Sequence, residues 1–216
     1  MSISLGEVQS LSVKAARGAG MEWGLAEEAG MAARWLCVHG LPGVEALAGL
    51  LRDQDGGDYA SSRPQTRSWP WYAEGQSLCP IKTGAAICDR ARLIKSGEGF
   101  ALQSTAWPIL LAPFLASAAS LTGKALKVSW QHVAVCVSSD STSVDGNVDM
   151  LMCPETANVA IKEVSALQCE LLLPHFRARP DEASLEYLTR LAHRTYAPET
   201  EQSRLSGAGA GLTDND

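Results

Sequence analysis

Apolar residues near the start of the chain recur every three or four positions, the spacing that places side chains on one face of an α-helix. Ser4, followed three residues later by Glu7, is typical of a capping box at a helix N-terminus. We therefore predict a first helix that begins after Ser4 and ends at Gly18 and Gly20, because glycine adopts the left-handed conformation of a C-cap without a steric penalty. The apolar positions of this helix are Leu5, Val8, Leu11 and Ala15.

A second helix is predicted from about Trp23 to Val38, ending at Gly40 with Pro42 just beyond it. Two adjacent ridges run along this helix, and one of them consists of small residues that let another helix approach closely. We expect an antiparallel hairpin with the first helix, followed by a short third helix that ends near Arg52. The ridges are Leu25, Ala29, Ala32 and Leu36, and Ala26, Gly30, Ala33 and Cys37.

Residues 53–76 are rich in Gly, Asp, Ser, Arg, Pro and Trp, which indicates a long loop. Its aromatic cluster, Trp69 to Tyr72, argues against free disorder. The loop either covers a groove or lies as a simple strap on the surface. Beyond it, residues 85–94 fit a strand or a helix, and the apolar run from Trp107 to Leu121 predicts a buried helix.

From residue 127 onward the apolar period changes to two, which indicates β-strands. We predict strands at Lys127–Val137, Asn147–Met152 and Asn158–Val164, separated by turns at Ser138–Gly146 and Pro154–Thr156. Short connections between sequential strands favour an antiparallel meander.

A last helix is predicted to begin at Pro180 and to bury Leu185, Leu188 and Leu191, before a Gly-rich, acidic tail at residues 207–216. The fold class is therefore predicted to be α+β. It comprises an N-terminal helical hairpin with a short third helix, a central apolar helix, an antiparallel sheet of at least three strands and a C-terminal helix. We expect residues 1–206 to form a single domain that carries the tail.

The composition favours a soluble globular protein, because 46% of the 216 residues are hydrophobic. A formal net charge of −6 argues against nucleic-acid binding. The N-terminus lacks the basic and apolar regions of a secretory signal, and the apolar run Ala106–Ala119 is shorter than the ~20 residues of a membrane span. We therefore expect a cytoplasmic protein without a membrane partner, whose six cysteines are mostly buried thiols.

Few residues point to a defined chemistry. His39, at the predicted end of the second helix, is either a structural cap or a functional group. Cys37 and His39 are the only local pair of potential zinc ligands in the sequence, so no metal site is predicted. Cys79 is the best placed candidate nucleophile, although nothing in the sequence lowers its pKa. The glycines between Arg17 and Gly24 follow a helix rather than a strand, which does not fit a phosphate-binding loop.

The C-terminal tail has two interpretations. It is either frayed and solvated, or it lies against the body of the protein and brings Asp214 to Arg194 or Arg17.

Two stretches, Arg17–Leu36 and Arg194–Asp216, resemble an uncharacterised bacterial family, the domain of unknown function 3726. The resemblance covers essentially the whole chain and implies that both ends belong to one functional unit, but it implies no activity. The helix pair that leads to His39 and Gly40 is also similar, more loosely, to the malate/L-lactate dehydrogenases that lack a Rossmann fold. Val38 stands where that family has a serine.

Our favoured hypothesis is a small-molecule metabolic enzyme or enzyme subunit, with a pocket between the N-terminal hairpin, the Trp69–Trp71 loop and the tail. The arginines of this pocket would bind an anion, and Trp23 would stack on the ligand. The carboxylates of the pocket would serve in acid-base chemistry or bind a cation. The alternative is a non-catalytic partner subunit or homo-oligomer that uses the small-residue ridges and exposed tryptophans as an interface. The sequence specifies neither a reaction nor a cofactor. The candidate pocket residues are Arg17, Glu22, Trp23, Arg194, Tyr196 and Asp214.

Overall fold

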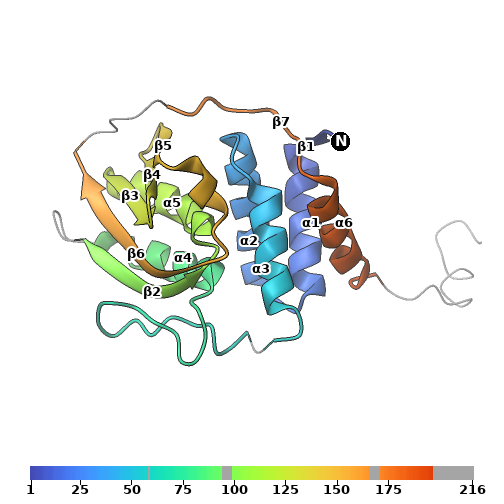
Figure 1. The fold of residues 1–216 in the computed structure, drawn as a ribbon, viewed down its shortest axis with the longest axis horizontal. Coiled ribbons are helices and arrows are strands. Elements are labelled where there is room, and N and C mark those ends of the chain that lie inside the picture. The colour runs from blue at the N-terminus through green and yellow to red at the C-terminus, as the bar shows by residue number, and fades with distance from the viewer. Residues whose placement is uncertain (58, 94–98, 166–170, 197–216) are drawn as a thin grey trace, which may run out of the picture.

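The computed structural model describes residues 1–57, 59–93, 99–165 and 171–196, and it has the predicted α+β fold (Figure 1). The Gly-rich tail lies outside the described residues. The helices are α1 (Leu5–Gly18), α2 (Trp23–Val38), α3 (Gly43–Gln54), α4 (Pro80–Asp89), α5 (Ala112–Thr122) and α6 (Glu182–His193). Three short 3-10 helices are η1 (Ala91–Leu93), η2 (Pro108–Leu111) and η3 (Val148–Met152). The strands are β1 (Ile3–Ser4), β2 (Phe100–Ala106), β3 (Ala125–Trp130), β4 (Val133–Val137), β5 (Thr142–Gly146), β6 (Glu155–Val164) and β7 (Arg177–Ala178).

The helices α1, α2, α3 and α6 form one half of the molecule (Figure 1). The predicted capping box begins α1, since the Ser4 N–H donates to the Glu7 carboxylate at 2.7 Å and the Glu7 N–H donates to Ser4 Oγ at 3.2 Å. The hairpin of α1 and α2 is also confirmed, with Gly30 facing Val13 and the Gln9 carbonyl of α1. Both ridges of α2 are largely buried within the chain.

The predicted role of Gly18 is only partly right. The turn after α1 uses Gly20, whose φ is +99°, whereas Gly18 is the last helical residue. A Cβ atom at Gly18 would collide with the carbonyl oxygen of Leu191 in α6. Gly18 therefore allows α1 and α6 to pack closely.

The second half is a 5-stranded antiparallel sheet with the strand order β2-β6-β3-β4-β5. The antiparallel prediction is confirmed, but the meander is wrong beyond β3, β4 and β5. The strand β6 returns across the sheet and pairs with both β2 and β3. This crossover encloses β6 between neighbours and leaves β2 at one edge.

Two of the predicted strands and one of the predicted turns are wrong. The range Lys127–Val137 is a hairpin of β3 and β4, because Gln131 turns the chain with a φ of 45°. The predicted turn Ser138–Gly146 contains the edge strand β5, and the predicted strand Asn147–Met152 forms the 3-10 helix η3 instead. The third predicted strand is confirmed as part of β6, which begins within the predicted turn at Pro154–Thr156.

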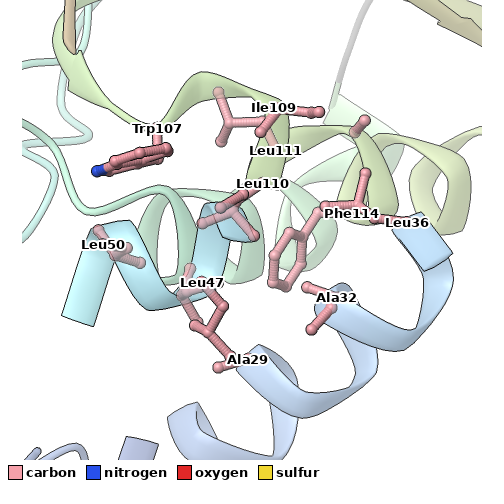
Figure 2. Close-up of a cluster of buried hydrophobic side chains, with 14 of the residues drawn as sticks. Ala29, Ala32, Leu36, Leu47, Leu50, Trp107, Ile109, Leu110, Leu111 and Phe114 are labelled. Carbon is pink, nitrogen blue, oxygen red and sulfur yellow. The ribbon is translucent and has the colours of Figure 1, made fainter. Parts of the chain in front are cut away.

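Helices α4 and α5 lie between the sheet and α2 (Figure 1). The ambiguous stretch after residue 84 continues α4 and then forms η1 as far as Leu93. The predicted apolar helix is present as η2 followed by α5. Figure 2 shows Leu110 and Phe114 of this segment pointing toward Ala32 of α2 and Leu47 of α3. This apolar layer joins the two halves.

The long loop contacts the sheet edge in its second part. The Trp71 N–H donates to the Ala101 carbonyl at 3.1 Å, and the Gln103 N–H donates to the Trp71 carbonyl at 2.8 Å. The loop therefore lies along β2 as a strap, and Trp71 is buried at 1% exposure rather than exposed. Trp69, which is 49% exposed, stacks on Trp71 with ring centroids 4.4 Å apart.

The chain returns from the sheet to the helical half through β7, which pairs with β1 next to the N-terminus (Figure 1). The predicted start of the last helix is confirmed, since the Asp181 carboxylate accepts the Ser184 N–H at 2.8 Å. Within the described residues, no helix is both long enough and apolar enough to cross a membrane.

The contact at Gly18 yields a stability prediction. Gly18→Ala should lower the free energy of unfolding by about 2 kcal/mol or more, because an added methyl group must push α6 away from α1. Gly24→Ala is the matched control, since no atom lies within 4 Å of its added Cβ, and it should be neutral or stabilising by up to about 1 kcal/mol. Urea denaturation of both variants measures the difference. Equal effects of the two substitutions would contradict the close packing.

Candidate functional site

A cleft of about 610 Å³ opens where the turn between α1 and α2 faces the first part of the long loop and α4. We call it the hinge cleft. Its N-terminal wall is the turn from Gly20 to Glu22, continued by Leu25. The opposite walls are the loop residues 59–66 and one face of α4.

The α4 wall follows from helix geometry. Lys82, Ala85, Ala86 and Asp89 recur at three- or four-residue spacing, which places them on one side of the helix, and Arg90 caps its end. The two alanines are small, so they leave space between the charged side chains at either end of this face. The wall combines an apolar floor with charged groups at its rim.

Three cations line the hinge cleft. The Arg90 guanidinium donates to Thr66 Oγ1 at 3.0 Å and lies 5.7 Å from the centroid of the Trp71 ring. The Lys82 ammonium donates to the Tyr59 carbonyl oxygen, so it ties α4 to the loop. Arg63 is exposed at the mouth, and no ion pair with the rest of the described chain holds it.

Carboxylates occupy another part of the same cleft. Glu22 and Asp89 both line it and are both exposed. Glu28 lies in the second turn of α2. The pKa of its carboxyl is above the ordinary value because the group is partly buried and lies near Asp89 and Glu27. The repulsion among these groups means that a bound cation would relieve a local excess of negative charge.

Tyr59 separates the hinge cleft from the protein interior. The ring lies close to Gly20, with Cε2 3.7 Å from the position of a Cβ there. The hydroxyl is buried and has no hydrogen-bond partner among the described residues, and burial raises the pKa of Tyr59. The polar end of this side chain therefore points away from solvent.

Cys79, the predicted candidate nucleophile, caps the N-terminus of α4 and is fully buried. Burial raises the pKa of its thiol, and this effect outweighs the hydrogen bonds from the Lys82 and Ile81 backbone N–H groups, which lower it. A neutral, enclosed thiol is a polar packing group rather than a ready nucleophile.

Of the predicted pocket residues that the structure describes, only Glu22 lines the hinge cleft. Arg17 donates to the Met21 carbonyl and stacks 4.8 Å from the Trp23 ring centroid, which places both side chains on the outside of the turn. Tyr196 contacts Lys14 and His193.

Arg194 forms an ion pair within the described chain. It pairs with Asp55 at 2.6 and 2.9 Å, and it also lies 3.5 Å from the Gly18 carbonyl oxygen. Asp214, which one of the two interpretations of the tail brings to Arg194 or Arg17, lies outside the described residues.

Cys37 and His39, the local pair of potential zinc ligands, both lie at the end of α2. His39 ends the helix as its C-cap and bonds the Trp35 carbonyl through Nδ1 at 2.9 Å, which is the structural alternative for this residue. Cys37 is largely buried and lines a second, open cleft of about 680 Å³, together with His175. No three His, Cys, Asp or Glu side chains of the described chain are grouped as a metal site.

Lys82, Arg63 and Arg90 were missing from the sequence prediction. The polar residues of α4 could have been found from their helical spacing, since Lys82 and Asp89 are seven positions apart. That spacing is informative only if residues 80–89 are identified as a helix, and the sequence left much of this stretch ambiguous.

The structure thus defines an α+β protein with a charged cleft at its helical hinge. Residues 3–79 match the family described as "Protein of unknown function (DUF3726)". This match confirms the resemblance over Arg17–Leu36, and it ends before Arg194–Asp216. It includes the hinge and loop walls of the hinge cleft, whereas the α4 residues from Lys82 to Arg90 lie beyond it.

No curated protein and no solved structure matches the chain. The similarity to malate/L-lactate dehydrogenases therefore stays an untested prediction.

The Asp55–Arg194 ion pair leads to a prediction about the pKa of the Asp55 carboxyl. The hydrogen bonds from Arg194 hold the pKa of Asp55 below the ordinary aspartate value of 3.8. Stability contributed by the pair is present above that value and is lost as the pH falls through the lowered pKa. Carboxyl NMR titration should show that Arg194→Gln moves the Asp55 pKa back toward 3.8.

Lys127→Gln is the matched control, because it removes a different ion pair, with Asp145 at 3.0 Å. It should leave the Asp55 titration unchanged. An Asp55 pKa that is the same with and without Arg194 would exclude the assigned cause.

Proposed function

We propose that this chain binds a small zwitterionic or anionic metabolite in the hinge cleft, as a metabolic enzyme or as the ligand-binding subunit of one. The observation that carries the proposal is the cleft itself, which combines a volume of about 610 Å³ with charged groups of both signs. Ligand pockets are typically ~300–1,000 Å³ and apolar with a few convergent polar groups.

The charges suggest how a ligand would be oriented. Arg63 and Arg90 form a site for a carboxylate or phosphate, because guanidinium groups bind these anions with two parallel hydrogen bonds. Glu22 and Asp89 form a site for an ammonium group. Leu25 and the alanines of α4 would contact the apolar part of the ligand.

Substituting the cleft rim tests the proposal. A thermal-shift screen of charged metabolites should raise the melting temperature of the wild-type protein with at least one zwitterion or organic anion. Arg63→Gln and Asp89→Asn should each weaken calorimetric binding of that compound by about tenfold, which is ~1.4 kcal/mol. Neither the Arg63 nor the Asp89 side chain makes a hydrogen bond within the described chain, so the fold should persist.

Arg34→Gln is the control for loss of one positive charge, because Arg34 is exposed on α2 and does not line the hinge cleft. It should leave the affinity unchanged. A screen without any stabilising compound, or equal losses from Arg63→Gln and Arg34→Gln, would refute the proposal.

An interaction subunit is the second candidate, favoured by a different observation. The extended segment after the sheet pairs with the edge of β5, where the Leu172 N–H donates to the Thr142 carbonyl at 2.8 Å. Leu171, Leu173 and Phe176 in this segment are exposed by 51%, 77% and 85%. The small-residue ridges of α2 no longer support this candidate, because they are largely buried inside the chain.

Light scattering tests the second candidate. If this segment joins two copies of the chain, the wild-type mass should rise with concentration, and the double substitution Leu173→Ser and Phe176→Ser should keep the protein monomeric. Tyr72→Ser is the control, since Tyr72 is 42% exposed on the distant strap. A wild-type protein that stays monomeric at all concentrations excludes self-association through this surface.

A further inference from the structure

The open cleft of about 680 Å³ at the C-terminal end of α2 has no part in the proposed function. We call it the α3 cleft. One of its walls is the turn from Gly40 to Pro42 together with the first turn of α3. The other wall is the segment 175–180, which passes the end of α2 on its way from the sheet to α6 (Figure 1).

The segment 175–180 is anchored on both sides of the α3 cleft. The His175 N–H donates to the Val38 carbonyl at 2.6 Å, and the N–H of Asp181, just after the segment, donates to the Glu45 carboxylate at 3.0 Å. Between these two hydrogen bonds, β7 pairs with β1. The fold therefore determines the position of this wall.

Three basic side chains, His175, Arg177 and Arg179, line the α3 cleft at alternating positions of the segment. Arg179 is exposed and forms no hydrogen bond or ion pair within the described chain. Arg177 donates to Ser2 through Nε and Nη2, both at 2.9 Å, and its Nη1 has no acceptor in the part of the chain that the structure describes. The His175 ring covers Gly40, since its Nε2 lies 2.8 Å from the position of a Cβ there. N–H groups of this wall are therefore available to a ligand.

Nearby carboxylates leave these donors available. Glu45 is the only acidic residue among the described residues that line the α3 cleft, and it already accepts the Asp181 N–H. Glu7 lies near Arg177 outside the cleft, but its carboxylate accepts the Ser4 N–H in the capping box. The N-terminus of α3 adds partial positive charge beside the cleft, because no side chain caps it. An anion would supply the missing acceptors.

Much of the remaining lining is apolar. Leu41, Val44 and Ala178 line the α3 cleft and are buried to 8%, 1% and 7% exposure, so they form its floor. Phe176 also lines the cleft, and 85% of it is exposed. A ligand with an apolar or aromatic body would contact this floor and would cover part of the Phe176 ring.

We propose that the α3 cleft is a second binding site, which takes a phosphate monoester with an apolar or aromatic body. The phosphate accepts hydrogen bonds from His175, Arg177 and Arg179, because its three terminal oxygens match these donors better than the two oxygens of a carboxylate. The body lies against Leu41 and Val44.

This site is separate from the hinge cleft. The hinge cleft is lined by the first turn of α2, and the α3 cleft by its last turn. Because α2 has 16 residues, ~24 Å of helix lies between them. The inference therefore goes beyond the proposed function and does not depend on it.

Phenyl phosphate, inorganic phosphate and benzoate serve as probes of the full chain. The first carries both the phosphate and the aromatic body, the second lacks the body, and the third replaces the phosphate by a carboxylate. Calorimetric titration, at a concentration at which light scattering gives the monomer mass, should give phenyl phosphate at least about tenfold higher affinity than either other probe.

Two substitutions test the assigned contacts. Arg179→Gln should weaken phenyl phosphate by about tenfold and leave the urea midpoint unchanged, because it removes a charged donor that has no partner in the described chain. Phe176→Ala should weaken phenyl phosphate by about threefold and leave inorganic phosphate unchanged. Arg34→Gln is the matched control for loss of one charge, since Arg34 is exposed on α2 and lines neither cleft.

Arg63→Gln separates the two clefts, and it should leave the affinity for phenyl phosphate unchanged. The inference is overturned if phenyl phosphate does not bind, or if inorganic phosphate or benzoate binds as tightly. Equal losses from Arg179→Gln and Arg34→Gln also overturn it. If Arg63→Gln weakens phenyl phosphate more than Arg179→Gln does, the ligand occupies the hinge cleft, which supports the proposed function and refutes the second site.

Discussion

Trp107 connects the helical half of the molecule to the sheet through its backbone and its side chain. Its backbone N–H donates to the Pro154 carbonyl at 2.8 Å, and its indole Nε1–H donates to the Asp53 carboxylate at 2.7 Å. The ring lies against Gly49 of α3, where any Cβ would collide with it (Figure 2 shows the ring beside Leu50). The backbone φ of 41° is unfavourable for a side chain of this size, so the surrounding contacts must hold Trp107 in place.

This connection also positions the hinge cleft. Asp53 fixes the end of α3, and the long loop starts there. Arg194 holds Asp55, Lys82 holds the Tyr59 carbonyl, and the hydrogen bonds of Trp71 fix the strap to β2. These contacts anchor the long loop at several points. The loop can therefore form one wall of the hinge cleft, although it contains no regular secondary structure.

The sequence predicted the elements that have a local chemical signal. Ser4 with Glu7 marks the start of α1 correctly, because the capping box is a short-range hydrogen-bonding pattern, and Pro180 marks the approach to α6. The turn at Gln131 carries no glycine or proline, and the apolar alternation continues through it, so two strands looked like one. The crossover of β6, the burial of Trp71 and the partner of Arg194 depend on contacts between distant residues. Such contacts produce no periodic pattern in the sequence. Among the described residues that line the cleft, Glu22 is therefore the only one that the sequence predicted.

The pairing of β1 with β7 joins the N-terminus to the segment that precedes α6, and Arg177 donates hydrogen bonds to Ser2 across 175 positions. Helix α1 then packs on α6, where Gly18 meets Leu191. During synthesis, α1 and α2 leave the ribosome long before the residues that cover α1 exist. The helical half can therefore complete its packing only after α6 has been made, although its first helices are made first. The matched segment, residues 3–79, accordingly lacks the surface that α6 provides and depends on the rest of the chain for it.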